Sequence, residues 1–297
     1  MARTTIDLSR LPPPDAVQVL DHEAIWAEIK AGIVADYPAA APALELDSEL
    51  IVKVGKVFAY GLMLKATDIN QPVRAAMPAL AMGADLEQIG VIVGIDRLVI
   101  DEGDPEQGIL PTFEDIEAYR RRFIMAPEGY SVAGPAGAYE FHALSADGDV
   151  LDASATSPSP GQVVVTVLSR TGDGSASAEL VQTVEDRVSA EDVRPLTDFV
   201  TVQGATIKPY QIEATLRTYA GPDAMVVMDA AQAAAEAFAR DNHRLGRDIN
   251  LSSIYAALTV AGVMRVDLTG PAANIVCDDT EAAFCTGVVL IHGGLDD

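Results

Sequence analysis

The spacing of apolar residues changes near Asp147, and this change constrains the fold more than any other feature of the sequence. Before it, apolar residues recur every three or four positions, as in an amphipathic helix. After it they alternate with polar residues, as in a strand with one buried face. The chain has 297 residues, 49% of them apolar, which is enough for a sizeable core. We predict an α+β protein with a helical N-terminal region followed by two small two-layer α+β domains.

The N-terminal half divides into an arm and a helical region. Residues 1–20 contain the prolines Pro12 to Pro14 and show neither a helical nor a strand period. Proline fixes the backbone and cannot donate a hydrogen bond, so we predict an extended arm over 1–20, of the kind that becomes ordered on a neighbouring protein. Residues 21–146 are predicted to be mainly helical.

Two helices of this region have clear signals. Asp21 can cap a helix from Asp21 to Tyr37, whose apolar residues fall on one side. From Leu46 onward a second apolar stripe predicts a long amphipathic helix. Pro72 and Pro78 are expected to break or kink the chain that follows, because proline removes a backbone donor and clashes with the preceding turn.

An acidic segment follows a short strand predicted at 97–100. Residues 101–117 hold seven acidic side chains and no basic one, together with glycines and prolines, which predicts an exposed loop near 101–112. Thr112 is expected to cap a helix that begins near Phe113. A second helix is predicted at 136–145.

Beyond residue 147 we predict one α+β domain over 147–205 and another over 206–297. The first is expected to contain strands at 150–157, 162–169 and 199–203, with a helix that Ser175 or Ser177 opens and that ends near Val188. The second is expected to contain strands at 210–219, 264–268 and 288–291 and helices at 222–242 and 251–258.

The charge of the chain limits its partners. Twenty basic residues stand against 44 acidic ones, giving a formal charge of −24. Such a surface repels phosphate backbones and anionic lipids, so we expect neither nucleic acid nor membrane as a partner. We also find no signal peptide and no run of roughly 18 apolar residues, and we expect a soluble protein. The charge either keeps the chain soluble or guides it onto a basic partner.

No pattern of catalytic or metal-binding residues stands out. The four histidines lie far apart, the segment 101–104 lacks the alternating oxygen ligands of a calcium loop, and the glycines of 171–177 are not followed by the lysine of a phosphate loop. We predict no catalytic residue, no cofactor and no metal site. Cys277 and Cys285 could face each other across a hairpin, but two unpaired buried thiols are the favoured alternative.

Several residues are candidates for contacts with other chains. They are the apolar residues Trp26, Ile29, Val54, Phe58 and Leu62 and the arginines Arg121, Arg244 and Arg247. The arginines either pair with nearby carboxylates such as Glu117 or Asp248, or reach across an interface, where arginine is enriched. Gly55 and Gly61 each weaken the long helix by about 1 kcal/mol, which predicts close approach of another segment.

Long stretches in the same order resemble one protein family. They include IDLSRLPPPDAVQVLDHEAI, FEDIEAYRRRFIMAPEGYSVAGPAGAYEFHALSADGDVLDASATSPSPGQVVVTVLSRTGDG, EDVRPLTDFVTVQ and HRLGRDINLSSIYAAL. The chain is similar over nearly its whole length to the baseplate J-like proteins of contractile-tailed phages. It departs from them after Ala59 and Tyr60, where apolar residues replace charged ones and predict a different packing partner.

This resemblance implies a structural subunit of the baseplate wedge. Its expected partners are further copies of the chain, a smaller wedge protein, the sheath-initiating protein and the central hub. The expected location is the virion tail, after synthesis in the bacterial cytoplasm. The alternative is the homologous subunit of a phage-tail-like bacteriocin or injection machine.

Two other classes compete with this interpretation. A hydrolase could use carboxylates among Asp101, Asp104 and Glu114. A receptor- or sugar-binding module would be expected to have a fold dominated by sheets.

Overall fold

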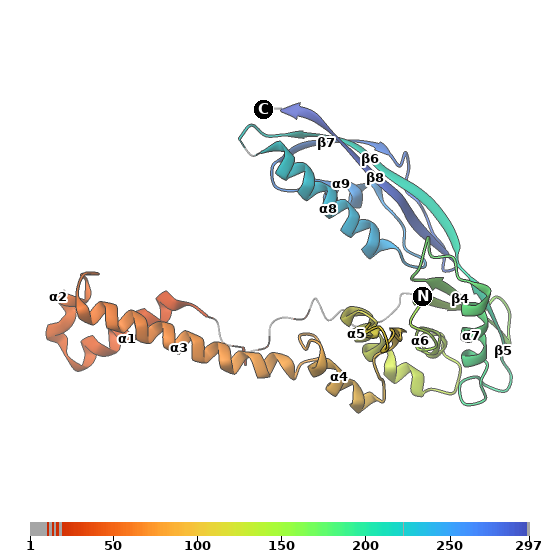
Figure 1. The fold of residues 1–297 in the computed structure, drawn as a ribbon, viewed down its shortest axis with the longest axis horizontal. Helices are drawn as coiled ribbons and strands as arrows, with labels where there is room; N and C mark the ends of the chain where they lie inside the picture. The colour runs from red at the N-terminus through yellow and green to blue at the C-terminus, as the bar shows by residue number, and fades with distance from the viewer. Residues whose placement is uncertain (1–10, 12–13, 15, 18–19, 222, 296–297) are drawn as a thin grey trace. The chain divides into compact units, whose positions relative to one another are not determined.

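The computed structural model describes residues 11, 14, 16–17, 20–221 and 223–295. The predicted arm over 1–20 lies mostly outside the described residues and stays a prediction. Residue contacts divide the chain into a helical unit, Met1–Asp96, and a second unit, Arg97–Asp297 (Figure 1). A helical N-terminal region precedes sheet-containing domains, which confirms the α+β class. The domain boundaries near 147 and 206 fall inside the second unit and stay predictions.

The helical unit is built around two helices that pack against each other. Its elements are α1 (His22–Asp36), η2 (Pro38–Ala40), α2 (Ala41–Leu44), α3 (Leu50–Ala75), α4 (Ala84–Gly90) and η3 (Val91–Val93). As predicted, the Asp21 carboxylate caps α1 by accepting from the backbone N–H groups of Glu23 and Ala24. Gly94 ends the last helical turn with a left-handed backbone, as a C-terminal glycine commonly does.

Helix α3 does not break at Pro72 itself but ends three residues later at Ala75, before Pro78, so the predicted break follows Pro72. Pro72 supplies no N–H, but its carbonyl still accepts from Ala76 N at 3.1 Å, so the last turn keeps its closing bond.

Among its described residues, the first half of the second unit contains a small hairpin, four helical segments and a three-stranded sheet. Its elements are β1 (Val99–Asp101), β2 (Thr112–Phe113), α5 (Ile116–Met125), η4 (Ala126–Tyr130), α6 (Ala136–Leu144), β3 (Val150–Thr156), β4 (Gln162–Ser169), α7 (Ala178–Val188) and β5 (Phe199–Gly204). The sheet order is β3-β4-β5, with β4 antiparallel to β3 and parallel to β5. Ser177 caps α7, the second of the two predicted serines.

The predicted start of α5 is wrong. Thr112 does not cap a helix, because Thr112 and Phe113 form β2 and pair with β1. The cap is Asp115, whose side chain accepts from Glu117 N and Ala118 N. Strand pairing with a segment eleven residues away overrode the local capping signal, which sequence spacing alone cannot detect.

The second half of this unit is a three-stranded sheet covered by two helices. Its elements are β6 (Thr206–Thr218), α8 (Ala224–Asn242), α9 (Leu251–Leu258), β7 (Val263–Gly270) and β8 (Glu281–Leu295). The order is β7-β6-β8, with β6 antiparallel to β7 and parallel to β8. Helices α8 and α9 lie on one face of the sheet, where their apolar side chains and those of β6 form a closed core (Figure 1).

The favoured alternative of two unpaired buried thiols holds for Cys277, while Cys285 is unpaired but only partly buried. Cys277 lies in the segment before β8 and Cys285 within it, and both are free thiols. Strand β8 begins at Glu281, earlier than the predicted 288–291, and pairs with β6 along most of its length. The two cysteines therefore do not face each other across a hairpin.

Candidate interaction surfaces

Helix α3 has two apolar faces, and only one of them is buried within its unit. The buried face follows helical spacing through Val52, Gly55, Ala59 and Ala66. These are small or medium side chains, so α1 can lie close to α3. At Gly55 the approach is closest, since a Cβ atom there would lie 2.2 Å from the Trp26 ring. The predicted close contact at Gly55 is confirmed.

The other face of α3 exposes large apolar side chains. Val54, Phe58 and Leu62 recur at intervals of four and are 45%, 66% and 54% exposed. Gly61 belongs to this surface and has no atom within 4 Å of an added Cβ, so the close approach predicted there is not present in the helical unit. We call Val54, Phe58, Gly61 and Leu62 the α3 apolar stripe; further apolar residues exposed on α3 are Leu50, Val57, Leu64 and Ile69.

The structure separates the predicted residues of this unit into two groups. Trp26 is 7% exposed and packs on Gly55, so it belongs to the core and not to an exposed surface. Ile29 is partly buried against the same cluster. The remaining three, Val54, Phe58 and Leu62, form the α3 apolar stripe. Their role in an interface stays a proposal.

In the second unit, three consecutive arginines of α5 each meet a different carboxylate. Arg120 pairs with Glu117 at 3.1 Å. Arg122 pairs with Glu114, and both side chains are buried. Glu114 also accepts from Leu98 N at 2.9 Å, so the predicted exposure of the acidic segment does not hold for Glu114. A buried carboxylate needs such partners, because desolvation otherwise penalises its charge.

The third arginine of α5 reaches a carboxylate that the sequence interpretation missed. Arg121 Nη2 lies 2.6 Å from Asp152 Oδ1, and Asp152 on β3 is fully buried. Asp152 also accepts from Ala153 N at 2.9 Å and, through Oδ2, from Leu245 N at 3.1 Å. Asp152 thereby joins α5, the first sheet and the segment after α8. Sequence patterns identify buried strand positions by apolar residues, so a buried aspartate gave no signal.

The two arginines after α8 differ in their surroundings. Arg244 Nη1 donates to the Leu151 carbonyl at 2.6 Å and is partly buried. Arg247 is exposed and donates from Nε to Asn242 Oδ1 at 2.9 Å. Among the described residues Arg247 forms no ion pair with Asp248, and Asp248 Oδ1 accepts a hydrogen bond from Cys277 N.

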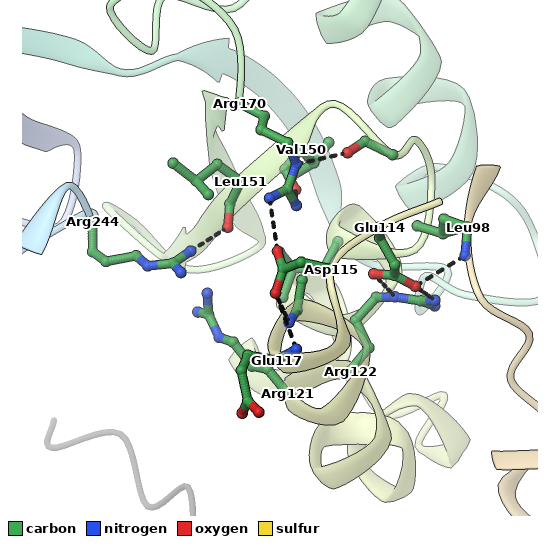
Figure 2. A pocket seen from close by; sticks show the side chains of 13 residues that line it. Leu98, Glu114, Asp115, Glu117, Arg121, Arg122, Val150, Leu151, Arg170 and Arg244 are labelled. Atoms are coloured by element: carbon green, nitrogen blue, oxygen red, sulfur yellow. Dashed lines mark hydrogen bonds and ion pairs between the residues drawn. The ribbon is translucent and has the colours of Figure 1, made fainter. Parts of the chain in front are cut away.

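Arg121, Arg122, Arg170 and Arg244 line a pocket of ≈ 80 Å³. Figure 2 shows Asp115 between Arg170 and Arg121, with Arg244 approaching from a different element. Arg170 directly follows β4 and donates to the Gly148 carbonyl at 3.1 Å. The pocket is therefore lined from α5, the first sheet and the segment after α8.

The carboxylates considered for hydrolysis do not form a site. Asp101 accepts from Gly103 N, and Asp104 accepts from Glu106 N and Gln107 N within their own turns. Glu114 is buried with Arg122. Within the described residues no group of three or more His, Cys, Asp or Glu side chains is arranged to hold a metal ion. A helix with the length and apolar character needed to cross a membrane is likewise absent from the described part of the chain.

The chain is similar to known proteins over nearly its whole length. Models of the baseplate J-like N-terminal, central and C-terminal domains match residues 47–104, 131–204 and 210–291. Baseplate protein J of Escherichia phage P2 is 47% identical over 300 residues, covering 98% of this chain and 99% of the phage protein. A cryo-EM chain of the anti-feeding prophage baseplate, 6-fold symmetrised, aligns with a TM-score of 0.39 and 13% identity, over 59% of this chain and 44% of that chain.

Proposed function

The chain belongs to the baseplate J-like family, and on that premise we propose that it is a non-enzymatic wedge subunit of a contractile-tail baseplate. Its location is then the virion tail, after synthesis in the host cytoplasm. The full-length similarity to the phage P2 protein supports a phage tail over the homologous subunit of a bacteriocin or injection machine.

The α3 apolar stripe is the observation that carries this proposal. Each large apolar side chain that becomes buried contributes roughly 1.5–3 kcal/mol relative to exposure. Val54, Phe58 and Leu62 remain exposed in the helical unit, so their burial by a partner would supply this stabilisation. A contiguous exposed apolar surface of this kind marks a site of association with other proteins. The stripe also contains Gly61, whose missing side chain lets another helix approach closely.

The proposed partners are other baseplate chains. They comprise further copies of this chain, a smaller wedge protein, the sheath-initiating protein and the central hub. The charge of −24 disfavours nucleic acid and anionic membranes as alternatives. It also keeps the free subunit soluble although its helical unit exposes apolar side chains.

The mass of the purified chain in solution tests the proposal. We would measure it by light scattering, alone and with the neighbouring tail proteins. The proposal predicts a defined complex that contains two copies of this chain and one smaller partner. A wild-type chain that remains a monomer with these proteins present would contradict the wedge role.

A matched pair of variants locates the contact. Phe58→Asp places a charge in the α3 apolar stripe, and Leu196→Asp makes the same kind of change at a side chain that is 96% exposed in the second unit. We expect Phe58→Asp to abolish the complex and Leu196→Asp to keep it. Fluorescence of Trp26, the only tryptophan of the sequence, verifies that the helical unit of Phe58→Asp is folded. Equal complex formation by both variants would exclude the stripe.

A further inference from the structure

Three guanidinium groups gather around the pocket of the second unit. They belong to Arg121 on α5, Arg170 after β4 and Arg244 after α8 (Figure 2). Their convergence is unusual in a chain with 20 basic and 44 acidic residues. Burial lowers the pKa of Arg244, and the like charges of Arg121 and Arg170 lower it further, while the carboxylates of Asp152 and Asp115 raise it. Burial and the like charges outweigh the two carboxylates, so the positive charge of Arg244 is only partly compensated.

The carboxylates near the pocket are already engaged. Asp152 accepts from Arg121 through Oδ1 and from Leu245 N through Oδ2. Asp115 uses Oδ1 to cap α5, and its Oδ2 lies 3.4 Å from Arg170 Nη1, at the long limit for a hydrogen bond. Glu114 pairs with Arg122. Each pocket carboxylate therefore has a partner other than Arg244.

Arg244 has more N–H donors than its hydrogen-bond partner among the described residues uses. A guanidinium group has five N–H donors in a planar fork. Among the described residues Arg244 forms no ion pair, and its hydrogen bond goes to the neutral Leu151 carbonyl. Burying a cation whose charge is only partly compensated is costly, so an anion in the pocket would stabilise this arrangement.

We propose that the pocket is an oxyanion-binding site and that its ligand is a carboxylate side chain of a neighbouring chain. Arg244 would bind the carboxylate through two parallel N–H donors, the geometry in which arginine holds carboxylates most strongly. A volume of ≈ 80 Å³ holds a group of this size, since a bound water needs only about 10–15 Å³ by such a measure.

The charge of the chain favours a protein carboxylate over a free anion. A net charge of −24 repels dianions such as phosphate from the surrounding solution. A carboxylate on a docking protein is brought to the pocket by the other contacts of the interface. The inference rests on the proposed function for the source of the ligand, while the oxyanion site can be tested on the purified chain.

The first experiment is a titration of the full chain with sodium acetate and, separately, with inorganic phosphate at constant ionic strength. Nitrogen-proton NMR of the arginine Nε–H groups reports binding. We expect saturable shifts in the wild type and in Arg247→Gln, which removes an exposed charge three residues from Arg244. Arg244→Gln should weaken binding at least tenfold. Arg170→Gln should also weaken it and provides a second variant if Arg244→Gln does not fold.

Three outcomes would overturn the proposal. Shifts that never saturate, or that are equal in wild type and Arg244→Gln, would identify an adventitious ion only. Saturable binding of phosphate but not of acetate would exclude a carboxylate ligand.

The third outcome comes from the mass of the baseplate complex. If Arg244→Gln forms the complex as well as Arg247→Gln does, the ligand is not a side chain of the partner. If instead the wild type forms no complex, the proposed function fails, but saturable acetate binding would still establish the oxyanion site.

Discussion

The helical unit and the second unit differ in how completely each buries its own side chains. In the second unit β6, α8 and α9 enclose fully buried Ile212, Leu216, Ile254 and Leu258, and buried charges such as Asp152 have partners. In the helical unit the core is a small cluster around Trp26, while α3 leaves Phe58 exposed. The second unit thus buries most of its large apolar side chains itself, whereas the helical unit leaves apolar side chains of α3 exposed that the proposed assembly would bury.

The largest expected effect is a loss of stability of the second unit when a buried charge is removed. Asp152→Ala leaves Arg121 without its carboxylate and Leu245 N without its acceptor. Breaking a buried pair costs roughly 3–5 kcal/mol. We expect the free energy of unfolding to fall by that amount, measured by urea denaturation with circular dichroism. Trp26 fluorescence should show an unchanged transition for the helical unit.

Asp173→Ala is the control for this prediction. Asp173 is exposed, and its replacement should change the free energy of unfolding by less than about 1 kcal/mol. A loss in Asp152→Ala no larger than in this control would mean that the charge network does not stabilise the second unit.

The next effect distinguishes the two faces of α3. At Gly55 an added methyl group would overlap the Trp26 ring, and overpacking of this kind costs roughly 1–3 kcal/mol. At Gly61 the same methyl group meets open space, and replacing glycine by alanine in a helix gains up to about 1 kcal/mol. Urea unfolding followed by Trp26 fluorescence should show Gly55→Ala destabilised and Gly61→Ala stabilised. Similar changes in both variants would refute the assignment of the two faces.

The smallest effect concerns pH and the second unit. Burial lowers the pKa of His142 below 6.5, with Arg187 lowering it further. The unfolded chain therefore binds more protons below pH 6.5 than the folded chain, so acidification through this range reduces stability and the loss is absent above it. In His142→Gln this component should disappear. The difference between wild type and variant, measured by urea unfolding at about pH 7.5 and 5.5, should change with pH; a constant difference would contradict the burial effect.

Helix caps and strands that depend on neighbouring residues could be predicted from the sequence. Asp21 and Ser177 provide the capping oxygens that α1 and α7 need, and the alternation of valines identified β4 at its observed limits. Gly55 was correctly associated with close packing, whereas no described segment of the chain approaches Gly61. Helix propensity predicts that a glycine weakens a helix. It does not reveal whether a segment of the same chain packs against that glycine.

Features that depend on distant pairing could not be predicted in the same way. Thr112 has the chemistry of a cap, but pairing with β1 placed it in a strand. Asp152 and Leu245 are 93 residues apart in sequence, and only the tertiary fold brings the carboxylate to that N–H group. Glu114 belongs by composition to an exposed acidic segment, and its burial depends on Arg122. The candidate pocket consists largely of such distant contacts.

Amide hydrogen exchange of the purified chain and of assembled baseplates tests the central claim most directly. If the helical unit completes its packing by assembly, the backbone amides of α3 around Phe58 will exchange much more slowly in the baseplate than in the free chain. The core strands β4 and β6 will be protected alike in both. Equal protection of α3 in the free chain and in the baseplate would contradict the account, because assembly would then leave the α3 apolar stripe uncovered.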